Sequence, residues 1–149
     1  EAEWEKAARG GSAGHRFPWN DTDRINPSRA SYYYKGFDEY DDVGDGDYPD
    51  FGDNYPYTAP VGYFAPNAYG LYDMAGNVQE WCWDKYWSGY YAVSPVNNPA
   101  GSTSWMDRYR VRRGGSWNHE AEECRVAARD AHLPASEDDM TGFRCVKRP

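Results

Sequence analysis

Frequent glycine and proline residues limit how much regular secondary structure this chain can form. Its 149 residues include 15 Gly and 10 Pro, the residue types that supply positive backbone φ angles and fixed turns. The length suits one domain with one core. We therefore expect short strands and one or two helices joined by long loops, which need metal ions or disulfides to hold them in place.

A few segments still carry periodic patterns. Residues 1–9 place Ala and Trp with helical spacing, and Gly10 and Gly11 end that pattern. Residues 31–36, 108–113, 124–130 and 142–146 are typical of short strands. With 14 Tyr and 7 Trp, we expect a core built from aromatic side chains. Because Trp and Tyr need hydrogen-bond partners when buried, this core should also contain polar groups.

The charge of the chain excludes some classes of partner. The net charge is −8 and no basic stripe is present, which argues against nucleic acid as a partner. No run of about 18 apolar residues occurs, so no membrane span is predicted. Acidic residues gather between Phe37 and Asp53, where they form either a solvated loop or an oxygen-rich cation site of the kind that Ca²⁺ prefers.

The three cysteines, Cys82, Cys124 and Cys145, leave at least one thiol unpaired within the chain. Their spacing, with that of the histidines, does not match a structural zinc site. Ser116 could act as a nucleophile only beside a base, and the sequence shows none.

Four stretches in order carry a resemblance: EAEWEKAARGG followed by RFPW, TAPVGYFAPNAYGLYDMAGNVQEW, RVRRGGSW, and RVAARD followed by GFRC. Together they resemble the formylglycine-generating enzyme family, also called sulfatase-modifying factors. Family domains are longer, so we interpret residues 1–149 as the C-terminal portion of a single such domain. The resemblance implies an α+β fold, a variant of the C-type-lectin-like fold, with little regular secondary structure and long loops.

Active members of that family oxidise a peptide cysteine to formylglycine with O₂ and a copper(I) ion held by two cysteines. Counted forward from GGSW, the two copper-ligand positions fall on His119 and Cys124. Counted back from RVAAR, they fall on other residues. The two counts differ because this loop is about three residues shorter than the same loop in active enzymes. The two-thiolate pair that suits Cu(I) is absent by either count. His119 and Cys124 are therefore either a degenerate copper site or, as we favour, a surface residue and a buried residue. Copper is not expected.

Disulfides follow from the same resemblance. Cys82 and Cys124 form a possible pair. Cys145 matches a family position that bonds to an earlier segment, so we expect it to be free or bonded outside this chain.

The resemblance also implies two structural calcium sites. The first uses the side chains of Asp73 and Glu80 and the backbone carbonyls of Gly76 and Val78; without calcium, the same residues are a turn with two solvated acids. The second, which matches less well, uses the positions Ser31, Tyr32, Asp53 and Tyr55. Both would pin loops and take no part in catalysis.

Three functions remain open. We favour a calcium-stabilised, non-oxidase binding or accessory module, over a divergent metal-dependent oxidase (formylglycine-generating or sulfoxide-synthase-like) and over a lectin-like receptor scaffold. Its groove would take a peptide, glycan or small polar ligand on the residues Trp117, Asn118, His119, Arg129 and Arg144. The N-terminal remainder of the domain or another chain is the expected protein partner. The pair EWCWD and CR is typical of bacterial members, and we expect a secreted or extracytoplasmic protein.

Overall fold

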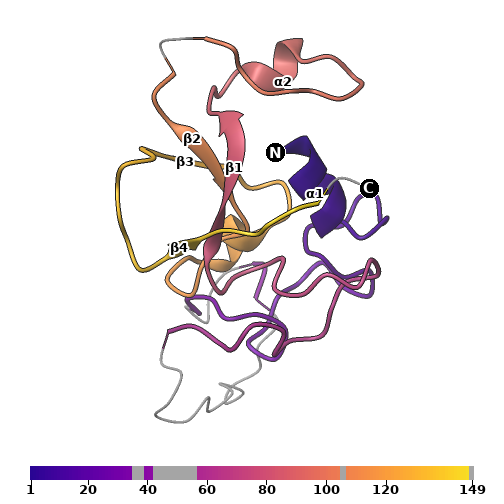
Figure 1. The fold of residues 1–149 in the computed structure, drawn as a ribbon. Coiled ribbons are helices and arrows are strands. Elements are labelled where there is room, and N and C mark those ends of the chain that lie inside the picture. The colour runs from indigo at the N-terminus through magenta and orange to yellow at the C-terminus, as the bar shows by residue number, and fades with distance from the viewer. Residues whose placement is uncertain (35–38, 42–56, 105–106, 148–149) are drawn as a thin grey trace.

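The short helices and strands lie between long irregular segments (Figure 1). The computed structural model describes residues 1–34, 39–41, 57–104 and 107–147. In chain order the elements are α1 (Ala2–Ala8), β1 (Gln79–Lys85), α2 (Tyr90–Val93), β2 (Arg110–Arg113), the 3₁₀ helix η1 (Ala121–Cys124), β3 (Asp130–His132) and β4 (Thr141–Gly142). This agrees with the loop-rich α+β fold. No helix in the described ranges has the length and apolar character needed to cross a bilayer.

One four-stranded sheet, in the order β3-β2-β1-β4, organises the molecule. β1 pairs antiparallel with β2, with Glu80 opposite Arg113 and Trp81 opposite Arg112. β2 pairs antiparallel with β3, and β4 joins β1 in parallel. Because side chains alternate along a strand, Glu80 shares one face of β1 with Cys82 and is buried, whereas Trp83 on the other face is 87% exposed.

Helix α1 packs on the buried face of the sheet. The indole Nε1 of Trp4 donates to Glu80 at 2.7 Å, and the Arg113 guanidinium lies 5.4 Å from the centre of the Trp4 ring. Arg113 also pairs with Glu5 at 2.5 Å. The helix ends as predicted, because Gly10 and Gly11 take φ angles of 56° and 86°.

The apolar core is small and lies mostly among the irregular segments. One cluster comprises the buried residues Phe17, Ile25, Ala30, Tyr32, Ala75, Ala121 and Cys124, and a second comprises Ala8, Met74 and Val126. The expectation of a core made chiefly of flat rings is wrong for the described residues, where many aromatic side chains are exposed, including Trp83, Tyr63 and Phe143.

Three predicted strands differ from the structure. Residues 124–130 do not form a strand: Cys124 closes η1 and β3 begins only at Asp130. The carbonyls of Val126, Ala127 and Ala128 accept hydrogen bonds from Arg113 instead of from a neighbouring strand. Of the predicted strand 142–146, only Gly142 lies in a strand, as the second residue of β4. Residues 31–34 are irregular, and residues 35 and 36 of that predicted strand lie outside the described ranges.

Candidate functional site

The turn at residues 73–77 has an unusual backbone. Asp73, Gly76 and Asn77 have φ angles of 56°, 70° and 65°, in the left-handed region that glycine enters freely and that Asp and Asn enter more often than other side-chain-bearing residues. A Cβ atom on Gly76 would lie 2.1 Å from the carbonyl oxygen of Ser31. The close approach of this turn to Ser31 therefore requires glycine at position 76.

Backbone hydrogen bonds tie this turn to two distant segments. The amide of Gly76 donates to the carbonyl of Gly114 at 2.7 Å, and the amide of Asn77 donates to the carbonyl of Ser31 at 2.7 Å. The backbone amide of Trp117 donates a hydrogen bond to the carbonyl of Asn77 at 2.9 Å. The turn therefore holds the Gly114-Gly115 loop in position.

The two carboxylates expected to bind calcium differ in their surroundings. Oδ2 of Asp73 accepts from the amide of Gly62 at 2.7 Å, while Oδ1 is buried and has no hydrogen-bond partner. Glu80 is 6% exposed and accepts from Trp4 and, at 2.7 Å, from Nη2 of Arg144. The buried, unpartnered oxygen of Asp73 suits a hard cation, whereas the Glu80 carboxylate is already neutralised.

Arg144 belongs to this turn and not to the expected groove. Besides Glu80, it donates to the carbonyl of Tyr72 at 2.8 Å. The hydrogen bond to Glu80 raises the pKa of Arg144 above its ordinary value, against the effect of burial. A calcium ion that bound both carboxylates would have to break the ion pair between Glu80 and Arg144. Within the described ranges no three His, Cys, Asp or Glu side chains form a ready metal site. Gly76 and Val78, the expected carbonyl ligands, lie between the two acids.

The second expected calcium site is described only in part, because Asp53 and Tyr55 lie outside the described residues. The Ser31 hydroxyl donates to the carbonyl of Tyr57 at 2.8 Å. The Tyr32 hydroxyl donates to Oδ1 of Asp41 at 2.8 Å.

The loop after Gly114-Gly115 contains a serine–histidine pair that the sequence analysis missed. Oγ of Ser116 and Nδ1 of His119 are 2.5 Å apart. The signal was available, since the two residues are three positions apart after a glycine turn. Ser116 is 0% exposed, so its hydroxyl positions His119 and cannot reach a substrate.

Cys124 is a core residue at the end of η1. It is 0% exposed, and a Cβ atom on Gly115 would lie 2.5 Å from its Sγ. Burial raises the pKa of the Cys124 thiol far above its ordinary value, so the metal-binding thiolate is strongly disfavoured.

The possible Cys82–Cys124 disulfide is not formed in the structure, where both thiols are free and buried. Cys82 lies on β1 beneath α1, whereas Cys124 packs in the cluster with Phe17. Burial also raises the pKa of Cys82, to about 11. The two thiols therefore lie in different parts of the interior and are not bonded to each other.

A small polar cavity lies where β2 turns into this loop. Its volume is about 110 Å³, and its lining residues are Gln79, Arg112, Arg113, Gly114, Gly115, His119, Glu123, Ala128, Arg129 and Asp130. Two of the five residues expected to form the groove, His119 and Arg129, meet here. Two of the lining residues each have a buried side-chain atom without a hydrogen-bond partner, Oε1 of Gln79 and Nε of Arg113.

The other three groove residues face elsewhere. Trp117 packs edge-on against Tyr57 at 4.6 Å and donates from Nε1 to the carbonyl of Asp139 at 3.2 Å. Asn118 donates to Sδ of Met140 at 3.6 Å. Both residues therefore cover the segment before β4.

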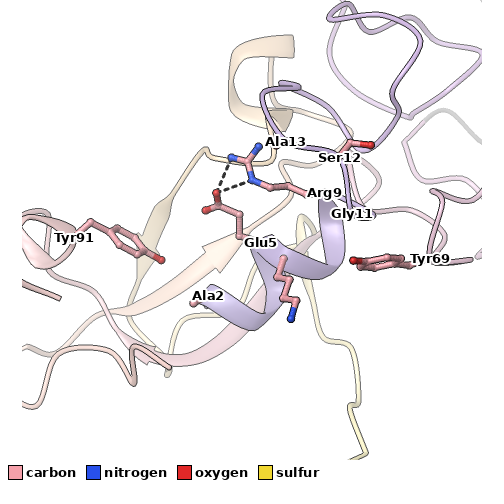
Figure 2. Close-up of a pocket in the computed structure, with 9 residues that line it drawn as sticks. Ala2, Glu5, Arg9, Gly11, Ser12, Ala13, Tyr69 and Tyr91 are labelled. Atoms are coloured by element: carbon pink, nitrogen blue, oxygen red, sulfur yellow. Dashed lines mark hydrogen bonds and ion pairs between the residues drawn. The ribbon is translucent and has the colours of Figure 1, made fainter. Parts of the chain in front are cut away.

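A wider concavity of about 440 Å³ runs along α1, with Tyr69 and Tyr91 at its two ends (Figure 2). Arg9 donates two hydrogen bonds to Oε1 of Glu5, at 3.0 and 2.7 Å, so these two charges offset each other. None of the three buried unpartnered atoms of the described chain lies in this groove. The cavity at Gly114-Gly115 is therefore the stronger candidate for a specific site.

Comparison with known proteins shows the family to which these residues belong. The chain matches the sulfatase-modifying factor enzyme 1-like domain over residues 1–149. It is 40% identical over 152 residues to a formylglycine-generating enzyme of Streptomyces coelicolor, covering 98% of this chain and 45% of that protein. It is 37% identical to the inactive C-alpha-formylglycine-generating enzyme 2 of Bos taurus, covering 98% of this chain and 42% of that one.

Among solved structures, Treponema denticola variable protein 1 superposes with a TM-score of 0.67 at 31% identity, over 95% of this chain and 44% of that one. The chain spans less than half the length of each of these proteins. Both the relative named as an enzyme and the relative named as inactive resemble it over the same residues, so similarity alone does not decide between them.

Proposed function

Because the chain belongs to the sulfatase-modifying factor enzyme 1-like family, we propose that it acts as a ligand-binding module of that family and not as an oxidase. The observation that supports this proposal most strongly is the burial of Cys124. It is the one thiol in the loop where the family's copper ligands are expected, and it is fully buried. Its neighbour in that role, His119, is held by Ser116 at 2.5 Å. The pair offers no exposed thiolates to a copper ion.

A peptide-oxidation assay tests this function. The protein is incubated with Cu(I), O₂ and a Cys-X-Pro-X-Arg peptide, and the peptide mass is followed. We expect the peptide cysteine to stay unconverted, because two accessible thiolates are needed to hold Cu(I) linearly. The Streptomyces coelicolor relative serves as the positive control. Formylglycine above the level of a copper-only control would overturn the proposal and favour a divergent oxidase.

We propose further that calcium stabilises the turn at residues 73–77. The buried, unpartnered Oδ1 of Asp73 supports this, together with a backbone whose φ angles are positive at Asp73, Gly76 and Asn77. Bound there, the ion would supply charge that holds the turn closed, with Asp73 and the nearby carbonyls as its ligands. Because Gly76 and Asn77 hydrogen-bond Gly114 and Ser31, stabilising this turn would also stabilise the cavity.

Calcium is accordingly expected to raise the melting temperature. At about a hundredfold excess over its Kd, a ligand adds about 2.7 kcal/mol, or roughly 5–10 °C for a chain of this size. The Asp73→Gly variant should lose most of that rise, since glycine accepts the φ of 56° but has no carboxylate. Melting with calcium and with chelator measures the difference.

Asn98→Gly is the matched control, because Asn98 also has a positive φ, 49°, and lies in an exposed loop. Its calcium-dependent rise should equal that of the unmodified protein. A rise of the same size in Asp73→Gly, or no rise in the unmodified protein, would contradict the calcium proposal.

A further inference from the structure

Four basic side chains line one surface pocket beside the end of α1. The pocket has a volume of about 360 Å³, and its basic lining residues are Arg9, His15, Arg16 and Arg125. The other described lining residues are alanine or glycine, so no acidic side chain is among them. The chain as a whole has a net charge of −8, which makes this local excess of basic groups unusual. The pocket shares no lining residue with the cavity at Gly114-Gly115.

Backbone and side-chain contacts hold these residues together. Nη1 of Arg9, just after α1, donates to the carbonyl of His15 at 3.1 Å. The amide of Val126 donates to the carbonyl of Arg16 at 2.8 Å, which places the neighbouring Arg125 beside Arg16. The pocket wall is therefore built from two parts of the chain that lie far apart in the sequence and are hydrogen-bonded to each other.

The guanidinium groups of Arg16 and Arg125 lie near the same aromatic ring. They are 5.0 and 5.5 Å from the centre of the Tyr40 ring. Two positive groups held at one ring repel each other. Arg125 pairs with Glu122 at 3.1 Å, but an exposed pair of this kind contributes little in water. An anion in the pocket would relieve the repulsion.

Hydrogen-bond donors of these two side chains remain available. Arg125 uses Nε and Nη2 to bind Glu122, which leaves Nη1 without a partner among the described residues. The guanidinium of Arg16 makes no hydrogen bond or ion pair within the described ranges, where its contact is with the Tyr40 ring. Several N–H groups can therefore reach one ligand in the pocket.

The nearby carboxylates are already in use. Arg9 pairs with Glu5 at 2.7 Å, and Glu5 also pairs with Arg113 at 2.5 Å, so one carboxylate serves two guanidinium groups. Asp23 lies 3.2 Å from His15 and accepts from the backbone amide of Arg16 at 3.0 Å. The positive groups of the pocket are thus only partly offset.

These donors match the oxygens of a phosphate group. The planar guanidinium binds phosphate through two parallel hydrogen bonds. A phosphate monoester carries about −1.5 to −2 charges at pH 7 and three acceptor oxygens, whereas a carboxylate has one charge and two oxygens. The volume of about 360 Å³ lies in the range of about 300–1,000 Å³ that is usual for ligand pockets. No atom lies within 4 Å of the Cβ position of Gly14, so this side of the pocket is open to a ligand.

We propose that this pocket binds a dianionic phosphate group, either as a phosphate monoester or as free phosphate. The phosphate oxygens accept hydrogen bonds from the guanidinium of Arg16 and from Nη1 of Arg125, and Arg9 adds positive charge at the wall. The inference goes beyond the proposed function, because it does not depend on whether the Cys124 thiol can be reached.

Titration of the ¹⁵N-labelled protein, followed by its backbone amide NMR signals, tests the site at about pH 7.5, where phosphate monoesters are largely dianionic. The phosphate ligand is N-acetyl-O-phosphoserine methylamide. The corresponding aspartate and serine compounds replace the dianion with a monoanion and with a neutral group. We expect saturable shifts of the amides of Gly14 and His15 with the phosphate ligand, and affinities at least about tenfold weaker for the other two compounds.

Inorganic phosphate, titrated in parallel, distinguishes the two sources of the phosphate group. Tighter binding of inorganic phosphate than of the phosphoserine compound assigns the pocket to the free anion. Weaker binding assigns it to a monoester.

A set of variants with equal changes of net charge checks the assignment. Arg16→Gln and Arg125→Gln should each lower the affinity for the phosphate ligand by about tenfold or more. Arg108→Gln is the matched control, because Arg108 is exposed and lies outside the pocket. It should bind within about twofold of the unmodified protein, since salt screens distant charges. Arg16 is exposed, so its replacement leaves the core intact, and the ligand series needs no variant.

Equal affinity for the phosphoserine and aspartate compounds would overturn the inference, and so would the absence of saturable binding. An equal loss of affinity in Arg16→Gln and Arg108→Gln would also overturn it, because net charge alone would then explain the binding. These results leave the proposed function standing, since that depends on the peptide-oxidation assay. Formylglycine in that assay would contradict the proposed function and would not affect this pocket.

Discussion

Replacing Gly76 with alanine is expected to destabilise the protein by about 3 kcal/mol or more. Two effects combine at this position. The φ of 70° places an L side chain in the left-handed region, and the new Cβ would lie 2.1 Å from the carbonyl oxygen of Ser31. That carbonyl cannot retreat freely, because it accepts the amide of Asn77 at 2.7 Å. Urea unfolding followed by tryptophan fluorescence measures the loss.

Gly70→Ala separates the two effects. Gly70 has nearly the same φ, 74°, but no atom lies within 4 Å of its Cβ position. Only the conformational cost should remain there, about 1–2 kcal/mol. Equal losses in the two variants would show that the close approach of the turn to Ser31 does not exist in solution.

Replacing Arg113 with methionine is expected to cost about 3–5 kcal/mol, the usual cost of removing one partner of a buried ion pair. The Arg113 side chain is completely buried and pairs with Glu5 at 2.5 Å. It also binds the carbonyls of residues 126–128. The loss would leave those carbonyls without a donor in the interior, and Oε2 of Glu5 without its partner, while Oε1 of Glu5 stays bonded to Arg9. Chemical unfolding again gives the free energy.

Adding Glu5→Gln to Arg113→Met should recover less than half of the loss, because the three carbonyls stay unsatisfied. Arg110→Met is the control on the same strand, since Arg110 stacks at 5.3 Å on the exposed Trp83. It should cost no more than about 1 kcal/mol. A comparable loss at both positions would contradict a special role of Arg113 in joining α1, β2 and the segment before β3.

Local patterns in the sequence were sufficient where the structure is local. The helix before Gly10 and the strand before Gly114 both form as expected, because periodicity and glycine breaks act within a few residues. Residues 124–130 looked like a strand for the same reason. In the structure, carbonyls of this segment accept hydrogen bonds from the Arg113 side chain instead of from a neighbouring strand. This contact is long-range, so no local sequence pattern indicates it.

The candidate site likewise has features that a local motif predicted and features that depend on long-range contacts. The Asp73–Glu80 turn was found from its motif, but the sequence did not show that Arg144 neutralises Glu80 from 64 positions away. The groove was placed from residue types, and only His119 and Arg129 meet in one cavity. Gln79 lies inside a motif that was interpreted for its calcium ligands, so its unpartnered amide oxygen became visible only in three dimensions.

The most direct test of the central claim is alkylation of the native protein, with each cysteine followed by peptide mass spectrometry. Cys145 is exposed, whereas Cys82 and Cys124 are buried. We predict that iodoacetamide modifies Cys145 readily and leaves Cys124 unmodified until denaturant is added, when all three cysteines react. Modification of Cys124 at a rate close to that of Cys145 would contradict the account. It would show a reachable thiol in the loop where a copper ion would bind.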